Sequence, residues 1–368
     1  MIILGIESSC DETAAAIVEN GTKILSNVVA SSVEIHKKYG GIIPEQAARE
    51  QINCIIPVIQ ESIRKAGFSL KKSSIIDAIA VTIGPGLIGS LLIGLETAKT
   101  LSFAWNKPII PVNHLIAHIY ANFLHYPLSL PCPALPAGRR QAGINFPALC
   151  LIVSGGHTEL VLMKNQAAPG GGQAQFQWIA GTRDDAAGEC FDKCSRLLGL
   201  GYPGGPAIEA SASRLKIKDL RSKEFKNLKL PRPMINEDNF DFSFSGLKTA
   251  VLNLIKKHHP LYILNNKSFI SYEIQEAIID VLVVKTLKAA KKLKVKSILI
   301  GGGVAANQRL RDKFLLAIQQ LTNVPIKLFI PEKKFCTDNA ATIASTAFYN
   351  YQPVSWQKLK PNPSLTIN

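Results

Sequence analysis

The stretch "IILGIESSCDETAAAIVENGTKILSNVV" (residues 2–29) is typical of a strand, a turn of small polar residues and two further strands joined by Asn-Gly. A similar unit returns at "PALCLIVSGGHTELVLMKN" (residues 147–165). Both units place a turn of small and polar residues between two apolar strands. Because one architectural unit occurs twice, the sequence predicts two related domains.

Helical and strand patterns alternate along the rest of the chain. A helix is predicted over residues 44–67, a strand over 77–83, and a strand over 107–112 that leads into another helix. The second half has a long amphipathic helix with Ile274 and Ile278 one turn apart, followed by a buried strand, a glycine turn and a helix. This alternation indicates an α/β fold.

Two segments lack such periodicity. Residues 125–147 and 165–177 are rich in Pro, Gly, Ala and Gln, and we expect them to be flexible insertions at loop tips. With 368 residues, the chain is long enough for two domains, each with its own buried core.

The charge balance is strongly basic. The 42 Lys and Arg residues outnumber the 27 Asp and Glu residues, which gives a formal net charge of +15. Such an excess attracts polyanions, of which nucleic acid is the commonest. The basic residues gather in residues 214–233, 255–259 and 285–296. Each cluster alone is compatible with a solvated helix face or loop, but three clusters in the second half predict tRNA or another RNA as a partner.

Composition also bears on location. No uninterrupted apolar run reaches the roughly 18 residues that a membrane span needs, and the N-terminus lacks the basic start of a signal peptide. We therefore expect a cytoplasmic protein without a membrane partner. The seven cysteines include no C-x-x-C pair, which argues against a disulfide framework or a thiolate zinc site.

Four turns contain glycine close to predicted strands: "GIESSCDET", "GPGLIGS", "VSGGHTE" and "IGGGVAAN". Such turns free backbone N–H groups for phosphate oxygens, and a following helix N-terminus adds a positive dipole end. None is a P-loop or the dinucleotide-binding G-x-G-x-x-G motif. Each alone can be an ordinary tight turn, but four around a repeated unit suggest a nucleotide held in a cleft between two related domains.

Two histidines lie four residues apart in "VNHLIAHIYANF" (residues 112–123). On a helix His114 and His118 share one face, so both imidazoles can reach one metal ion, or each can simply hydrogen-bond to its neighbours. Zinc proteases read H-E-x-x-H, with the glutamate as general base. Here Leu115 follows the first histidine, so the protease base is missing from its place.

Several acidic residues lie near the glycine turns. Asp338 precedes a helix of small residues, where it could be the N-cap of that helix or a ligand. Another acidic group surrounds Gly204 and Gly205, and it is compatible with an acidic helix start and a Pro-Gly turn or with binding of metal or ribose. Its members are Asp184, Asp185, Glu189, Asp192 and Glu209.

An ordered set of nine motifs carries a resemblance to a known family. The motifs are "GIESSCDET", "GPGLIGSLLIGLETAK", "NHLIAH", "VSGGHTEL", "DDAAGECFDK", "GYPGGPAIE", "FSFSGLKTA", "GGGVAANQRLR" and "CTDNAA". In these motifs the chain resembles the bacterial tRNA N6-adenosine threonylcarbamoyltransferase family, whose members were once described as glycoproteases. The resemblance covers nearly the whole chain apart from the two insertions.

The resemblance implies an α/β fold of the actin, Hsp70 and sugar-kinase (ASKHA) class, with two duplicated domains around a nucleotide cleft. One actin-like subdomain would comprise residues 1–124 plus 338–368, and the other residues 148–337. It also implies that one divalent metal ion, Fe²⁺ or Zn²⁺, is held by three residues. They are His114, His118 and Asp338.

A substrate site is implied in the same way. Threonylcarbamoyl-adenylate would be bound by the "IVSGG" turn and four more residues, with ATP or AMP in the same cleft. These residues are Ile152, Val153, Ser154, Gly155, Gly156, Asp192, Gly205, Glu209 and Asn307. Asp192 and Glu209 suit ribose hydroxyls. Asp11 and Glu12, in the first turn, would orient the incoming amine or assist proton removal as catalytic residues.

The implied reaction is acyl transfer to tRNA. The exocyclic amine of the adenosine 3′ of the anticodon, in tRNAs that read codons starting with A, attacks the carbamoyl carbon and AMP leaves. The hypothesis is that the metal stabilises developing negative charge as a Lewis acid. The implied partners are tRNA, a smaller actin-like paralogue and a P-loop ATPase, while a separate synthase supplies the adenylate.

Some positions depart from the family pattern. Ala48 and Gln51 stand where the family often has serine and histidine, so this chain lacks those two side chains. Ile152 stands where archaeal and eukaryotic relatives place a tyrosine near the metal, which favours the bacterial branch. A metalloprotease, a non-catalytic actin-like scaffold and a small-molecule kinase of the same fold are the alternative functions.

Overall fold

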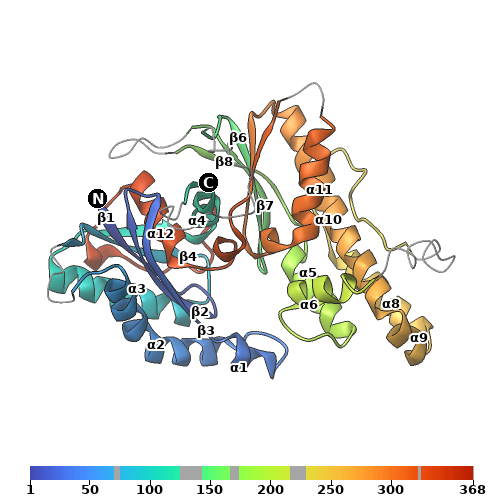
Figure 1. The fold of residues 1–368 in the computed structure, drawn as a ribbon, viewed down its shortest axis with the longest axis horizontal. Helices are drawn as coiled ribbons and strands as arrows, with labels where there is room; N and C mark the ends of the chain where they lie inside the picture. Colours follow the sequence, from blue (N-terminus) through green and yellow to red (C-terminus); the bar gives the residue numbers. More distant parts are fainter. Residues whose placement is uncertain (70–74, 125–142, 166–173, 216–228, 322–324, 368) are drawn as a thin grey trace.

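Two mixed five-stranded sheets with helices on their faces form the centre of the computed structural model (Figure 1). Of the two predicted insertions, residues 125–142 and 166–173 lie outside the described part of the chain. The described residues are 1–69, 75–124, 143–165, 174–215, 229–321 and 325–367.

The first sheet has the strand order β3-β2-β1-β4-β5. Its central strand β1 pairs antiparallel with β2 and parallel with β4. The strands are β1 (Ile2–Glu7), β2 (Glu12–Glu19), β3 (Lys23–Ser31), β4 (Ala78–Gly84) and β5 (Ile109–Asn113).

The second sheet has the order β10-β9-β6-β7-β8 and repeats the topology of the first. Its central strand β6 pairs antiparallel with β7 and parallel with β9, as β1 does with β2 and β4. The strands are β6 (Ala148–Val153), β7 (Thr158–Met163), β8 (Phe176–Gly181), β9 (Ser297–Gly301) and β10 (Lys327–Phe329). The shared topology confirms the duplicated α/β architecture.

Strand β8 was not predicted from the sequence. Phe176 and Gln177, which the sequence assigned to the second insertion, are its first two residues and pair with Met163 and Leu162 of β7. Most of β8 is at least partly exposed, so it lacks the continuous apolar run that marks the central strands. All six residues of β6, by contrast, are buried, because both faces of that strand are covered.

Helices cover both faces of the first sheet. Helices α2 and α3 pack on one face, and α12 packs on the other. Gly5 of β1 allows the close approach of α12, because a Cβ on Gly5 would lie 2.3 Å from the carbonyl oxygen of Ala340. The helices of this first lobe are α1 (Val33–Lys37), α2 (Pro44–Lys65), α3 (Ile88–Trp105) and α12 (Ala340–Tyr349).

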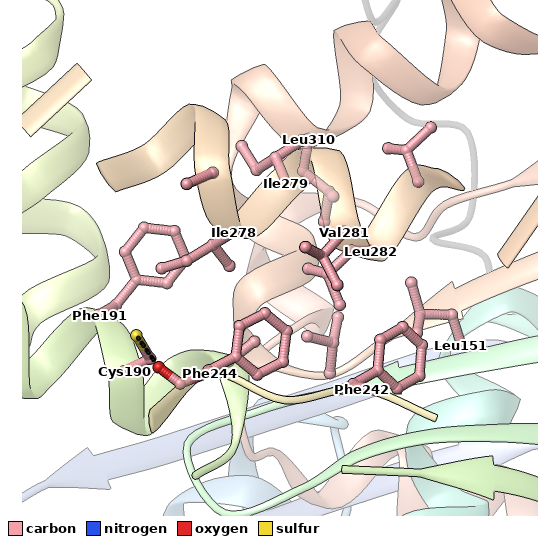
Figure 2. Packing of buried hydrophobic residues seen from close by; sticks show 14 of the residues in the cluster. Leu151, Cys190, Phe191, Phe242, Phe244, Ile278, Ile279, Val281, Leu282 and Leu310 are labelled. Carbon is pink, nitrogen blue, oxygen red and sulfur yellow. Dashed lines mark hydrogen bonds between the residues drawn. The ribbon is translucent and has the colours of Figure 1, made fainter. Parts of the chain in front are cut away.

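The second sheet packs against a core centred on the long helix α10. Phe242 and Phe244 stack with ring centroids 6.4 Å apart, and Cys190 donates to the carbonyl oxygen of Phe244 (Figure 2). The helices of this second lobe are α5 (Ala187–Leu197), α6 (Gly204–Ala212), α8 (Ser245–Lys257), α9 (Pro260–Asn265), α10 (Lys267–Lys292) and α11 (Gln308–Gln319). Among the described residues, no helix combines the length and apolar character that a membrane crossing requires.

Helix α4 (His114–Tyr120) lies between the two sheets (Figure 1). Ala117 belongs to the core beneath the first sheet, whereas Leu115 and Ile119 belong to the core beneath the second. The two cores therefore use two stripes of the helix, and the stripe of His114 and His118 is left for polar contacts.

Gly301, at the end of β9, fixes how closely α4 approaches the second sheet. A Cβ on this residue would lie 2.3 Å from the carbonyl oxygen of His118. Since real Cβ atoms do not come so near to backbone oxygen, any side chain here would displace the helix. Gly303, two residues further on, has nothing within 4 Å of an added Cβ.

The Gly301→Ala variant is therefore expected to lose about 1–3 kcal/mol of unfolding free energy, the usual cost of overpacking a closed contact. Chemical denaturation of the variant beside Gly303→Ala measures this loss. The Gly303→Ala control should unfold almost like wild type, and equal stability of the two variants would contradict the close contact at His118.

Candidate metal centre

Two histidines of α4 project from the start of the helix toward one point. Asn113 ends β5 and caps α4, because its side-chain oxygen accepts from the backbone N–H groups of Leu115 (2.9 Å) and Ile116 (3.4 Å). The cap fixes the first turn, which carries His114, and His118 follows one turn later. Their ring centroids are 4.6 Å apart, so the predicted common face is confirmed.

Asp338 joins these histidines from a segment more than two hundred residues away in sequence. Its Oδ1 lies 3.5 Å from Nε2 of His114 and 3.5 Å from Nε2 of His118. Asn339, not Asp338, caps α12, since its side-chain oxygen accepts from the N–H of Thr342. The carboxylate of Asp338 is thereby left free to face the two imidazoles.

Protonation differs among the three groups. Burial alone would raise the pKa of Asp338, but the positive charge of His114 outweighs it and lowers the pKa to about 2. Burial and the charge of His114 lower the pKa of His118 to about 4. Burial also opposes the charge of His114, but the carboxylates of Asp338 and Glu7 raise its pKa well above the ordinary value.

Glu7 is the partner of His114 that sequence reasoning missed. Its Oε2 lies 3.0 Å from Nδ1 of His114 and accepts from the hydroxyl of Thr82 at 2.6 Å, while Oε1 accepts from the N–H of Ser9 at 2.5 Å. The side chain is 1% exposed. An acidic residue at the end of an apolar strand was the available signal, but the partner lies 107 residues away.

The chemistry of these side chains fits a divalent metal ion. One ligand atom from each of His114, His118 and Asp338 lies within 4.8 Å of the others. Nε2 of His118 is buried and has no hydrogen-bond partner in the described part of the chain. Two imidazoles and one carboxylate leave coordination positions for further ligands and suit zinc or Fe²⁺. A carboxylate behind a ligating imidazole, as Glu7 is here, fixes the ring and its tautomer.

Arg311 holds the segment that carries Asp338. Its guanidinium donates to the carbonyl oxygen of Pro331 at 2.7 Å and to the sulfur of Cys336 at 3.1 Å. It also donates to the carbonyl oxygen of Ala305 at 2.8 Å. The turn after β9 and the segment before α12 are thus tied together by one side chain.

The predicted catalytic pair, Asp11 and Glu12, lies in the turn after β1. Gln51 of α2 braces this turn, because its amide donates to the carbonyl oxygens of Cys10 (2.9 Å) and Glu12 (3.0 Å). Gln51 therefore has a structural role. Burial, followed by the charges of Asp338 and Asp11, raises the pKa of Glu12 to about 9.

The "IVSGG" segment divides into a buried and an open part. The side chains of Ile152 and Val153 are fully buried in β6, so only their backbone could contact a ligand. Ser154 begins the turn and accepts from the N–H of His157 at 3.2 Å. An added Cβ on Gly155 or Gly156 would meet nothing within 4 Å, so these two residues face open space.

Gly205 and three polar residues predicted to bind substrate lie at, or contact, helix starts of the second lobe. Gly205 also faces open space. Asp192 accepts from the N–H of Gly204 at 2.6 Å, and Glu209 accepts from the N–H of Gln308 at 2.8 Å. Asn307 caps α11 by accepting from the N–H of Leu310 at 3.0 Å and donates to Gln275. Each polar residue thus has a structural partner.

The "GPGLIGS" loop contacts protein on its glycine faces. A Cβ on Gly86 would lie 2.4 Å from the carbonyl oxygen of Ser9, and one on Gly84 would lie 1.8 Å from that of Asn362. These glycines allow the loop to back the first turn and the C-terminal segment. Of the four turns predicted to contact phosphate, this one packs against neighbouring backbone.

Charged groups of the two lobes influence one another. Burial and the charges of Asp11 and Asp192 raise the pKa of Tyr202, which follows α5. Arg196 of α5 donates to the carbonyl oxygen of Gly40, in the segment between α1 and α2, at 2.5 Å. The first turn, with Asp11, and the helix that carries Asp192 are therefore neighbours across the two lobes.

The Glu7→Gln variant is expected to bind Zn²⁺ about 10–100-fold more weakly than wild type, as is usual when the residue behind a ligating histidine is lost. Ion binding must displace the proton of His114, so wild-type affinity should rise with pH through the neutral range. The rise of affinity with pH should be shallower in the variant, because one of the two carboxylates that raise the pKa of His114 is gone.

Competition with a chromogenic chelator measures both affinity and slope. Glu19→Gln, which removes the carboxylate of a surface ion pair with Lys23, is the matched control and should behave as wild type. Unchanged affinity and slope in Glu7→Gln would rule out the positioning role of Glu7.

Comparisons with known proteins agree with this geometry. The family model of TsaD, tRNA N6-adenosine threonylcarbamoyltransferase, matches residues 23–345. The protein of that name from Syntrophomonas wolfei is 46% identical over 366 residues, which cover 99% of this chain and 97% of the relative. The one from Bacillus subtilis is 48% identical over 345 residues, which cover 94% and 89%.

A solved structure is similar in fold alone. Full-length HypF, in a phosphate- and nucleotide-bound form, matches 96% of this chain with 47% of its own length, at 13% identity and a TM-score of 0.54. The likeness agrees with the predicted two-domain α/β fold of the actin, Hsp70 and sugar-kinase class. Since the family model spans most of the chain and full-length relatives share nearly half of its residues, this chain belongs to the tRNA N6-adenosine threonylcarbamoyltransferase family.

Proposed function

We propose that this chain transfers the threonylcarbamoyl group from threonylcarbamoyl-adenylate to tRNA. The acceptor is the exocyclic amine of the adenosine 3′ of the anticodon in tRNAs that read codons starting with A. The observation that carries the proposal is the cluster of His114, His118 and Asp338 in a chain of this family. The buried Nε2 of His118, which has no hydrogen-bond partner among the described residues, favours a metal-binding enzyme over a non-catalytic scaffold.

The chemical step forms one bond and breaks one. The amine nitrogen attacks the carbamoyl carbon, the bond from that carbon to the phosphate oxygen breaks, and AMP leaves with the bonding electron pair. The amine loses one proton to a base. The protein must therefore position two large substrates, accept a proton and stabilise negative charge.

The adenylate is proposed to bind on the open side of the glycine turns. Gly155, Gly156 and Gly205 have free space where other residues carry a side chain, so a nucleotide could approach their backbone closely. Asp192 and Glu209 each use one carboxylate oxygen to hold a helix start, and each has a second oxygen suited to a ribose hydroxyl. Asn307 supports this arrangement by capping α11.

His114, His118 and Asp338 would hold the divalent metal ion, with Glu7 behind His114. When bound, the ion supplies a Lewis-acid charge that stabilises negative charge on the substrate. The protein contributes a fixed ligand set, because the cap of α4 and the contacts of Glu7 hold the imidazoles before any substrate arrives.

Glu12 is proposed as the group that accepts the proton from the amine, with Asp11 orienting the acceptor. A pKa near 9 keeps the carboxyl of Glu12 largely protonated at neutral pH. The charge of Asp338 is one cause of this shift, so a cation beside Asp338 lowers the pKa. The working pKa of Glu12 would then lie between its ordinary 4.5 and about 9, close to the pH at which a base is most effective.

Single-turnover transfer by wild type is accordingly expected to accelerate as pH rises and to level off above the working pKa of Glu12, which lies between 4.5 and about 9. In Glu12→Gln the rate should fall by about 100-fold or more and should lose this ascending limb. Rapid-quench measurement of labelled tRNA across pH tests both effects, with the exposed Glu34→Gln as control. An unchanged pH profile in Glu12→Gln would remove Glu12 from the proton transfer.

Three partner proteins belong to the proposal: a smaller actin-like paralogue, a P-loop ATPase and a separate synthase that supplies the adenylate. An exposed apolar face on the first lobe supports binding of the paralogue. Ile52 of α2 and Ile88 of α3 are 62% and 51% exposed. They flank a close contact of the two helices, where a Cβ on Gly89 would lie 3.2 Å from Cβ of Ala48.

The decisive experiment measures incorporation of labelled threonine into an unmodified tRNA. The reaction contains ATP, bicarbonate, the synthase and the two partner proteins, with wild type beside His118→Ala. We expect incorporation by wild type and a loss of about 100-fold or more in the variant. Wild type stripped of metal and then reloaded controls for damage to the fold.

Other outcomes favour other functions. If neither protein incorporates threonine although the wild-type chain binds the adenylate, the scaffold is the better interpretation. Proteolysis by purified wild type that disappears in His118→Ala would instead support the metalloprotease.

A further inference from the structure

We propose that the helical hairpin that runs from α8 through His258, His259 and α9 to the start of α10 is the docking surface for the sugar-phosphate backbone of the tRNA anticodon stem. This inference rests on the proposed function. It assigns a task to the basic segment around residues 255–259, for which the transfer chemistry has no use.

The hairpin carries positive charge without any compensating acid. Between Phe242 and Tyr272 the chain contains no Asp or Glu. The segment has four lysines, and none of them forms an ion pair with the described residues. These lysines are Lys248, Lys256, Lys257 and Lys267.

Elsewhere on the second lobe, some lysines are paired. Lys193 binds Asp185 at 2.6 Å, and Lys288 binds Asp238 at 2.9 Å. The lysines of the hairpin have no such acidic partner among the described residues, so their charge is available to a ligand. Such a surface attracts a polyanion, because each phosphate contact releases a condensed counterion.

The base of the hairpin lies beside the turn that follows β6, which contains Gly155 and Gly156. Asp184 accepts from the N–H of Phe244 at 2.7 Å and from that of Ser245 at 3.2 Å, which fixes the first turn of α8. Phe244 is anchored in the core against Cys190 of α5 (Figure 2). The start of α5 touches the glycine turn, since a Cβ on Gly188 would lie 2.5 Å from the carbonyl oxygen of Ser154.

The hairpin extends from this base away from the rest of the second lobe (Figure 1). The 13 residues of α8 span about 20 Å, which is roughly the length of six stacked nucleotides. A loop nucleotide held near the glycine turn would thus place the adjoining stem along α8. The stem backbone would then reach the lysines at the far end of the helix.

The tip combines charge with flat rings. Lys256 and Lys257 are both exposed at the end of α8. His258 stacks on Tyr262 of α9, with ring centroids 4.3 Å apart and an interplanar angle of 19°. RNA-binding surfaces use this combination, in which cations contact phosphates and rings contact bases or sugars.

An acidic protein partner is the competing occupant. Leu261 and Leu264 of α9 are each 60% exposed and would suit a protein contact. The lysines favour RNA, because four unpaired cations on a segment of 31 residues without an acid match a phosphate backbone better than a mixed protein surface.

The test uses a Lys256→Gln/Lys257→Gln double variant of the full chain and an unmodified tRNA transcript. The Kd for tRNA should rise roughly tenfold, and the plot of log K against log salt should become shallower by about two, one for each lost phosphate contact. The KM for tRNA should rise while kcat and zinc affinity stay unchanged. Glutamine is nearly as good a helix former as lysine, so α8 should remain folded.

The matched control is Lys358→Gln/Lys360→Gln, which removes two exposed charges from the C-terminal segment of the first lobe, outside the three basic clusters of the sequence. Its net charge equals that of the test variant, and the hairpin is unchanged. We expect the control to bind tRNA almost as wild type does.

The possible outcomes separate the two proposals. If wild type neither binds nor modifies tRNA, the proposed function itself fails and the inference fails with it. If wild type is active and the hairpin variant keeps the wild-type Kd and salt slope, the docking surface lies elsewhere. If the variant slows transfer only when the protein partners are present, with tRNA binding unchanged, the hairpin binds a protein and the inference is overturned.

Discussion

Two carboxylates, one buried and one partly buried, share one imidazole, and the rest of the structure depends on this interaction. Glu7 and Asp338 approach opposite nitrogens of His114, and the charged partner offsets the cost of removing the acids from water. The first sheet supplies Glu7 and its partner Thr82, the start of α4 supplies the imidazole, and the segment before α12 supplies Asp338. Four elements from both ends of the chain must therefore meet at one point.

Helix α4 links the pairing at His114 to the packing of both sheets. Its three stripes serve the first sheet, the second sheet and the metal centre, so a shift of the helix in favour of one would disturb the others. Gly301 sets the distance between the helix and the second sheet. A rigid core of this kind allows the ligands to be positioned by packing before any ion or substrate binds.

Structural and functional interpretations of the polar residues overlap in the second lobe. Asp192, Glu209 and Asn307 each hold a helix start, as ordinary capping residues do, yet they surround glycines that face open space. One carboxylate oxygen can hold a helix while the other binds a ligand. The glycine turns differ in the same way: those at Gly155 and Gly205 are open, whereas the one at Gly86 is filled by backbone.

Local patterns in the sequence determined the duplicated α/β topology and most of the elements, although not β8, because side-chain spacing within a strand or helix is a local property. The spacing of His114 and His118 likewise predicted one shared face. Only the tertiary structure decided whether Asp338 was a cap or a ligand, since that depended on Asn339 taking the cap. It alone revealed Glu7, and it alone assigned Gln51 as a brace. These contacts join segments that packing brings together, and spacing along the chain carries no record of them.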